Sequence, residues 1–261
     1  PAFVAISDRT ILRVIVAYAA AFVAFGLAID GPSAVARGLL EILTTRDALL
    51  TDYFGIGGIG AGCVNAGLLT LAACLVYHRT GTRMTGSAVA CLWLVLGFGL
   101  FGKNLLNVWS IVAGVALYAR VRGEPFSAHV NTAFFGAALA PVFTEVVVAP
   151  GFDAEILFST SLVPAFSVPL AIVTSLVIGF ILAPAAAQLF KAHMGFSLYN
   201  MGFTAGIVGT LVVATYKSYG FVPEPVFIWT TGNNVVLGSF MAALLASMVA
   251  LGWYFDRGLF A

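Results

Sequence analysis

The chain has 261 residues, of which 61% are hydrophobic and 9% are charged, far below the roughly 25% charged residues of an average soluble protein. The mean hydropathy of +1.04 comes from apolar runs along the whole sequence, which indicates a polytopic integral membrane protein. The 12 basic and 11 acidic residues leave a net charge of +1, which excludes nucleic acid as a partner because such binding needs many basic contacts to phosphates.

Apolar segments follow one another from the first residues to the last. A helix needs about 20 apolar residues to cross the hydrocarbon core of a bilayer. Charged residues separate candidate segments at 11–29, 53–77, 86–102, 104–119, 132–149, 157–187, 195–215 and 227–254. We therefore predict an all-α fold with about seven to eight hydrophobic segments, in one transmembrane domain over residues 1–261. No basic region or cleavage site precedes the first run, so we expect no cleaved signal.

The stretch between the first two segments has a different composition. It mixes apolar and charged side chains, namely Leu39, Leu40, Ile42 and Leu43 with Arg37, Glu41, Arg46 and Asp47. This pattern is typical of an amphipathic helix that lies at the membrane surface. Residues 11–51 are thus expected to form one span followed by an interfacial helix.

The basic residues predict the orientation of the chain, because Lys and Arg are retained on the cytoplasmic side. They lie in short connections, at Arg9, Arg13, Arg79, Arg83, Arg120, Arg122, Lys191 and Arg257. The connection 150–155 carries only acidic charge and is expected outside. Threading the segments between these points places both termini in the cytoplasm, and we expect the bacterial inner (plasma) membrane.

Several segments are short or interrupted. Segments 86–102 and 104–119 are each short, and segment 157–187 contains Pro164, Pro169 and Pro184. At membrane depth, non-helical backbone is tolerated only where it faces protein or a water-filled path. Broken or re-entrant helices are therefore expected here, and functional residues near them.

An internal repeat relates the middle of the chain to its later part. An offset of 96 residues places Asn104 over Asn200, Gly99 over Gly195 and Ile111 over Ile207. In the predicted topology the matched segments run in opposite directions, which gives inverted repeat halves at 53–150 and 151–254. Inverted repeats are a recurrent construction of transporters and channels, with the solute site near the midplane. Alternatively, the glycines only pack helices closely.

Short motifs at these positions resemble the urea transporter family. They are VNAGLL at 64–69, GLFGKN at 99–104, LAPVFT at 139–144, LVPAFSVPL at 162–170 and GFSLYN at 195–200. The resemblance covers about half of the chain and implies a path for urea-like amides. The sequence departs from the family where Lys103 replaces an aromatic residue, and where the later proline-rich element precedes the asparagine element.

The run GFGLFGKN and the stretch ALAPVFTE are similar to an uncharacterised bacterial membrane family, the domain of unknown function 1576. That resemblance implies a membrane location and no particular activity. It is a closer overall match than the one to the urea transporter family.

Two ionisable residues lie within or near apolar spans. A charge at the bilayer centre costs about 2.5–3.5 kcal/mol on insertion scales, so Lys103 should face a cavity or a partner. Otherwise it lies at the outer interface and reaches into the headgroups. Glu145 near the end of its segment is a partner for Lys103, a proton-coupling site, or an interfacial carboxylate.

The leading hypothesis is a channel or transporter for a small polar solute, either a urea-like amide or a small anion. Its path is expected to be lined by Asn65, Phe101, Lys103, Asn104, Pro164, Pro169, Tyr199 and Asn200. Asparagines and aromatic residues suit an uncharged amide, whereas Lys103 favours an anion. The alternatives are a proton-coupled transporter that uses Glu145, and a scaffold or sensor that transports nothing.

Other classes of function find little support in the residue pattern. The chain lacks paired carboxylates, a nucleophile beside a histidine, and metal-ligand spacing, so we expect no enzyme, no cofactor and no metal. The cysteines Cys63, Cys74 and Cys91 lie in apolar runs and are expected in the core. The expected partners are the lipid bilayer and a small polar solute, with a homo-oligomer as an option.

Overall fold

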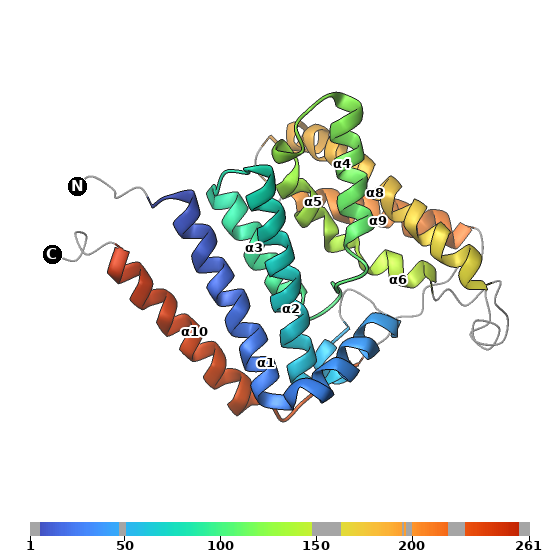
Figure 1. Cartoon of the computed structure of the whole chain (residues 1–261). Helices are drawn as coiled ribbons and strands as arrows, with labels where there is room; N and C mark the ends of the chain where they lie inside the picture. Colours follow the sequence, from blue (N-terminus) through green and yellow to red (C-terminus); the bar gives the residue numbers. More distant parts are fainter. Residues whose placement is uncertain are drawn as a thin grey trace.

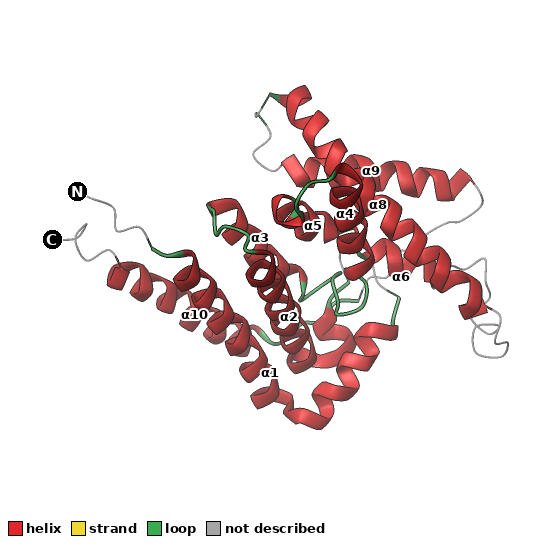
Figure 2. Cartoon of the chain, turned by 45° about the horizontal axis from the view of Figure 1, so that its top comes forward, coloured by secondary structure: helices red, strands yellow, loops and turns green. Residues whose placement is uncertain are grey.

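The computed structural model describes residues 6–46, 51–147, 163–194, 196, 200–218 and 228–255, with side chains from residue 167 onward in the third of these ranges. Within these ranges every regular element is a helix, as Figure 2 shows, so the all-α prediction is confirmed. The α-helices are α1 (Asp8–Thr44), α2 (Tyr53–Thr80), α3 (Gly86–Phe98), α4 (Trp109–Arg122), α5 (Val130–Gly136), α6 (Pro141–Val147), α8 (Val163–His193), α9 (Asn200–Ser218) and α10 (Asn234–Phe255). Short 3-10 helices η1 (Phe126–Ala128) and η2 (Ala137–Leu139) flank α5.

Long apolar helices make the chain compatible with an integral membrane protein. In the described ranges four helices are long and apolar enough to cross a membrane, namely α1, α2, α8 and α10. A fifth is added if α5 with η2 and α6, bent by 46°, count as one span. The 13 residues of α3 and 14 of α4 extend about 20 Å each, too short for a hydrocarbon core of about 30 Å. Seven to eight crossing segments are therefore not confirmed.

Two of the long helices are kinked at glycines. Gly31 in α1 has a φ of 75° and Gly58 in α2 has a φ of 87°, a backbone region that favours glycine. At these kinks Asp30 Oδ2 accepts a hydrogen bond of 2.6 Å from the backbone N–H of Gly60, which ties the two helices together. Residues 32–44, predicted as a separate interfacial helix, thus continue α1 beyond its kink and change direction there (Figure 1).

By contrast, the prolines of α8 do not interrupt it. The helix continues through Pro169 and Pro184 to His193, so the breaks predicted at these two prolines are wrong, and residues 157–162 of the segment lie outside the described ranges. A membrane helix tolerates proline because neighbouring groups satisfy the freed carbonyl. The interruptions found lie elsewhere, between α3 and α4 and between α5 and α6.

The helices form two groups, α1, α2, α3 and α10 on one side and α4, α5, α6, α8 and α9 on the other (Figure 1). Glycines allow close crossings within each group: a Cβ on Gly26 would lie 2.4 Å from the Gly60 carbonyl oxygen, and one on Gly114 would lie 2.2 Å from that of Leu176. One apolar core joins the groups, with Leu92, Ile111, Phe134 and Ile178 among its buried residues. The predicted core cysteines Cys63, Cys74 and Cys91 are buried and unpaired, which confirms that prediction.

Helix α10 lies antiparallel along α1. Tyr18 and Ser247 share a hydrogen bond of 2.8 Å, and the rings of Phe25 and Phe240 stack with centroids 3.9 Å apart. Of the residues of α10, only Leu244 is buried.

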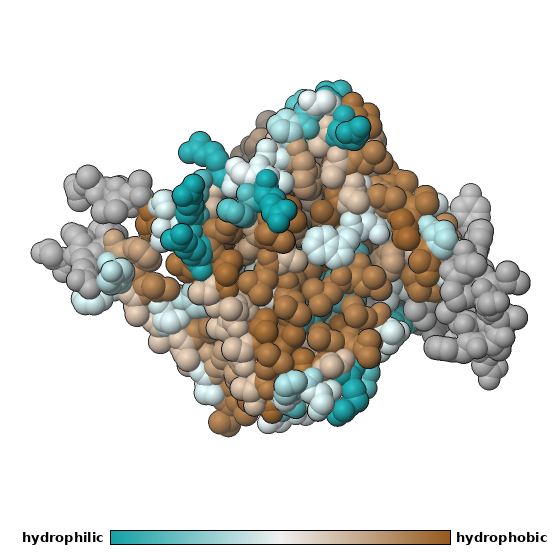
Figure 3. All heavy atoms as spheres, viewed as in Figure 1, coloured by the Kyte–Doolittle hydropathy of each residue, from teal (hydrophilic) through white to brown (hydrophobic). Residues whose placement is uncertain are grey.

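The surface of the molecule is divided by hydropathy. Hydrophobic residues cover the middle of the face in Figure 3 and hydrophilic residues gather toward its upper and lower edges, a distribution that suits lipid around the middle.

Candidate functional site

The site is built around the non-helical segment that connects α3 to α4. Residues 99–108, called the break loop here, leave helical geometry at Gly102, whose φ is 73°. Lys103, Asn104 and Asn107 in this loop are each no more than 1% exposed. Buried loops are unusual because each backbone N–H and C=O needs a partner away from water.

Asn65 of α2 supplies several of those partners. Its Nδ2 donates to the carbonyl oxygens of Gly99 at 2.6 Å and Lys103 at 2.9 Å, and its Oδ1 accepts from the N–H of Leu105 at 3.2 Å. The Asn65 side chain is itself 0% exposed. One side chain in the middle of α2 therefore fixes both the beginning and the centre of the break loop.

Asn104 and Asn107 hold the second half of the loop. Asn104 Oδ1 accepts from the N–H groups of Leu106 and Asn107 at 2.9 Å each, and Asn107 Oδ1 accepts from the N–H of Asn104 at 2.9 Å. Such short-range bonds compete with helix formation, which explains why α4 begins at Trp109 and not at 104 as predicted. Sequence analysis missed Asn107. The signal was the spacing of three between two asparagines, which allows reciprocal capping.

Lys103 points into the protein and not toward the headgroups. Its Nζ donates to the Phe134 carbonyl oxygen of α5 at 3.2 Å and lies 4.7 Å from the centroid of the Phe98 ring. Among the described residues no carboxylate forms an ion pair with it. The side chain is 1% exposed, so the predicted alternative in which it reaches out into the headgroups is wrong.

Glu145 is paired with a different cation from the one proposed. Arg46, after the end of α1, places Nη2 3.0 Å from Glu145 Oε2 and Nε 3.4 Å from Oε1. The Arg46 and Glu145 side chains are 15% and 12% exposed. The predicted partnership of Glu145 with Lys103 is therefore wrong, and Glu145 instead ties α6 to the end of α1.

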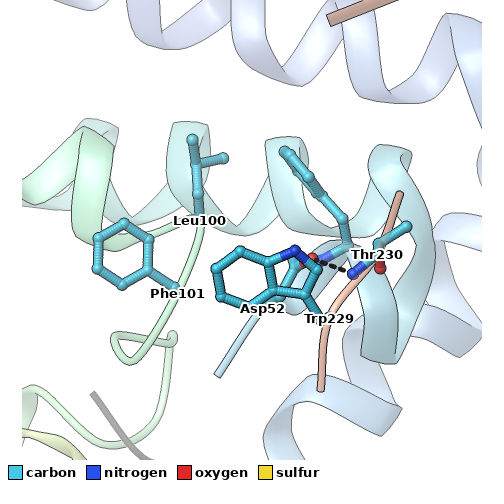
Figure 4. Close-up of a pocket in the computed structure, with 6 residues that line it drawn as sticks. Asp52, Leu100, Phe101, Trp229 and Thr230 are labelled. Atoms are coloured by element: carbon cyan, nitrogen blue, oxygen red, sulfur yellow. Dashed lines mark hydrogen bonds between the residues drawn. The ribbon is translucent and has the colours of Figure 1, made fainter. Parts of the chain in front are cut away.

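One pocket lies on the α2-start side of the break loop and is called the Asp52 pocket. It encloses about 400 Å³ and is lined by Asp52, Phe54, Leu100, Phe101, Trp229 and Thr230. Asp52 accepts from the N–H groups of Phe54 at 2.9 Å and Thr230 at 3.1 Å, so both carboxylate oxygens are engaged. Figure 4 shows the Trp229 indole beside Asp52, with Phe101 of the break loop on the other side.

A second pocket, the Asn131 pocket, lies beside the starts of α3, α5 and α9 and the end of α8. It encloses about 630 Å³, and its polar lining residues are Ser87, His129, Asn131, Thr132, Lys191 and Asn200. Asn131 accepts a hydrogen bond from the Tyr77 hydroxyl near the end of α2. Asp52 directly precedes the first residue of α2 and Tyr77 lies in its last turn, so the two pockets lie near opposite ends of the same helix.

The predicted path residues fall in several places. Asn65, Lys103 and Asn104 meet in or at the break loop, Phe101 lines the Asp52 pocket, and Asn200 lines the Asn131 pocket. Pro169 is exposed on α8 and contributes to neither pocket. The Pro164 side chain and Tyr199 lie outside the described residues. Across the described ranges, no three His, Cys, Asp or Glu side chains are grouped to hold a metal ion.

Comparison with known proteins adds a family and no activity. No curated protein and no solved structure matches the chain, so the urea transporter resemblance rests on its short motifs. The family model described as "Protein of unknown function (DUF1576)" matches residues 32–218. That range includes the break loop, the Arg46–Glu145 pair and α2 to α9. The limb of α1 before its kink at Gly31 and all of α10 lie outside it. Because the match covers most of its length, the chain belongs to this family of proteins of unknown function, DUF1576.

Proposed function

We propose that the protein is a membrane channel or transporter for a small polar solute, a urea-like amide or a small anion. In this proposal the break loop closes a path between the Asp52 pocket and the Asn131 pocket. The observation that carries it is the buried, polar, non-helical loop between two pockets near opposite ends of α2. Transporters build solute sites from interrupted helices at membrane depth, since broken helices expose backbone groups that can bind a solute.

The inverted-repeat interpretation is part of this proposal, and helix ends support it. With the offset of 96 that relates Asn104 to Asn200, α4 ending at Arg122 corresponds to α9 ending at Ser218. The end of α3 at Phe98 corresponds to within one residue of the end of α8 at His193. Helix α3 begins beside the Asn131 pocket and α8 ends there, as Ser87 and Lys191 line it, so the matched helices run in opposite directions.

The orientation is proposed from the charges at the Asn131 pocket end. Arg79 of α2, Arg120 of α4 and Lys191 of α8 lie in the last turns of helices that end there. By the distribution of basic residues we place this end and both termini in the cytoplasm, across a bacterial inner membrane. The partners we propose are the bilayer and the solute, with no nucleic acid and no enzymatic reaction. A homo-oligomer is compatible with this arrangement.

Proton coupling through Glu145 is the second candidate. The observation that favours it is the position of Glu145 next to Thr144, whose Oγ1 lies 3.5 Å from Asn107 Nδ2 of the break loop. Releasing Glu145 from Arg46 would therefore act close to the loop. This version requires that uptake depend on a pH gradient and fail in Glu145→Gln.

The test is stopped-flow light scattering on proteoliposomes shocked with urea, formamide, acetamide and small anions. Empty liposomes and the Gly206→Ala protein are the controls, since nothing lies within 4 Å of a Cβ at Gly206. We expect faster re-swelling for one class of solute, lost in Asn65→Ala and Asn104→Ala proteins that remain folded. Folded wild-type protein with no flux of any solute, with or without a pH gradient, would overturn transport and favour a scaffold or sensor.

A further inference from the structure

Among the described residues, no acidic side chain pairs with the charge at the centre of the break loop. Arg46 is paired with Glu145, and His129 lies 2.6 Å from Glu124. Lys103 has no ion pair in the described part of the chain, and its Nζ has one hydrogen bond, to a backbone carbonyl oxygen. An isolated buried charge is so costly that it is normally paired or neutralised. Within the described ranges, two of the three N–H donors of this ammonium have no hydrogen-bond acceptor, which leaves them available to another group.

Two of the three side-chain amide donors of the site, those of Asn65 and Asn107, are already engaged, whereas Asn104 Nδ2 has no hydrogen-bond acceptor among the described residues. Asn65 Nδ2 is used by two carbonyl oxygens of the loop, and Asn107 Nδ2 donates to the Gly102 carbonyl oxygen at 3.1 Å. The side-chain oxygen of Asn65 and that of Asn104 each accept from N–H groups of the break loop. A urea-like amide that binds Asn65 or Asn107 would have to displace these bonds, whereas a group that binds the Lys103 ammonium would not.

Lys103 is separated from the Asn131 pocket by a single short helix. Its hydrogen-bond acceptor is Phe134 of α5, and the neighbouring residues Asn131, Thr132 and Phe135 of the same helix line the pocket. Helix α5 has 7 residues, and the helix pair that contains it is bent by 46°. A displacement of this helix would bring the ammonium and the pocket together.

Resting on the proposed function, we propose that the transported solute is a small monovalent anion and that the Lys103 ammonium is its binding group. The anion supplies the counter-charge that the described protein lacks. The Asn131 pocket admits it on the side where Lys191 stands, and the Asn residues serve to hold the loop in place around it. Asn65 and Asn104 are positioning residues in this account.

The experiment compares anion and urea fluxes in the same proteoliposomes. Chloride, nitrate and formate efflux is recorded for wild-type, Lys103→Arg, Lys103→Met and Gly206→Ala proteins, with urea re-swelling in parallel. Lys103→Met keeps the length of the side chain and removes its charge. We expect anion efflux well above empty liposomes and no urea flux, with at least about a tenfold loss in Lys103→Met, partial retention in Lys103→Arg and no change in Gly206→Ala.

The outcomes separate this inference from the proposed function. Urea flux without anion flux, or anion flux unchanged in Lys103→Met, would overturn the inference and leave the transport proposal standing. An absence of any flux from folded wild-type protein would overturn both. If Lys103→Met does not fold, the wild-type ratio of anion to urea flux decides, together with the reversal potential in a potassium chloride gradient, which must report anion selectivity.

Discussion

Asn104 and Asn200 occupy matched positions in the proposed repeat, yet their surroundings differ. Asn104 is 1% exposed, and its side-chain oxygen holds two N–H groups of the break loop. Asn200 lies at the start of α9, where it contacts His193 at 2.7 Å, donates to the Ala186 carbonyl oxygen at 3.2 Å and lines the Asn131 pocket. The same residue type holds the buried break loop in place in one region and lines a pocket in the other.

The difference follows from what encloses each asparagine. The break loop is covered by α2, α5 and α6, through Asn65, Phe134 and Thr144. The side-chain hydrogen bonds of Asn200 to the described residues go to His193 and Ala186 of α8, and water can reach it through the pocket. Loss of a hydrogen bond should therefore lower the free energy of unfolding strongly at Asn104, where no other group replaces the partner. The loss should have a small effect at Asn200, where water can replace it.

The largest expected effect is at Asn65. Asn65→Leu keeps the volume but leaves two carbonyl oxygens and one N–H of the break loop unpaired away from water. Each unpaired buried group costs about 1–3 kcal/mol, so we expect a loss of about 3–5 kcal/mol in the free energy of unfolding. Thermal unfolding in detergent, followed with a thiol-reactive dye that labels the buried cysteines on exposure, measures it.

Asn200→Leu is the matched control for this comparison, with an expected loss of about 1 kcal/mol because water replaces the partners. Equal losses at the two positions would show that the break loop is no more enclosed than the start of α9. That result would remove the contrast on which the closed path is argued.

The next largest effect is at the crossing of α4 and α8. A Cβ at Gly114 would lie 2.2 Å from the Leu176 carbonyl oxygen and 3.0 Å from the Gly179 Cα, both backbone atoms. The helices must separate, so Gly114→Ala should lower stability by about 2–3 kcal/mol. Gly206→Ala, where nothing lies within 4 Å, should be neutral or up to about 1 kcal/mol stabilising by helix propensity. Similar melting curves for both variants would contradict the close crossing.

The sequence predicted helices better than it predicted their breaks. Apolar length was enough for the all-α class and for the position of α2 and α10, because hydropathy reports the solvent around a helix. It could not place the breaks. The prolines of segment 157–187 suggested one that α8 does not have, while the actual loop is held by side-chain hydrogen bonds from Asn65, 34 residues before Gly99.

The candidate site shows the same limit. Lys103 and Asn104 were recognised because polar residues are costly within apolar runs. Their partners were not, since the Phe134 carbonyl oxygen carries no sequence signal and Glu145 could pair with any nearby cation. The pocket residue Asn131 was also missed, because a single polar residue at a helix start is ordinarily a cap.

Accessibility gives a third way to sharpen the contrast between the two asparagines. Asn200→Cys should react with a small water-soluble thiol reagent, whereas Asn104→Cys should react about 100-fold more slowly because the loop must open first. The native cysteines are buried and give a low background. Reaction rates are read by mass spectrometry. Comparable rates would mean that the break loop opens freely to water and does not close the path.

The smallest expected effect is at the Arg46–Glu145 pair, which joins α1 to α6 outside both asparagine sites. The two side chains are only 15% and 12% exposed, so solvent screens the pair weakly, but the cost of desolvating both charges offsets much of their attraction and the net contribution of the pair should be about 1 kcal/mol. A double-mutant cycle of Arg46→Met and Glu145→Gln, read by thermal unfolding, measures it.

Uptake of solute by the same variants then distinguishes the roles of Glu145. A structural tie predicts that Glu145→Gln lowers stability and leaves flux per folded molecule unchanged, because Lys103 and the loop remain in place. A flux lost in Glu145→Gln alone, at unchanged stability, would transfer the coupling role to Glu145 and make the pair part of the mechanism.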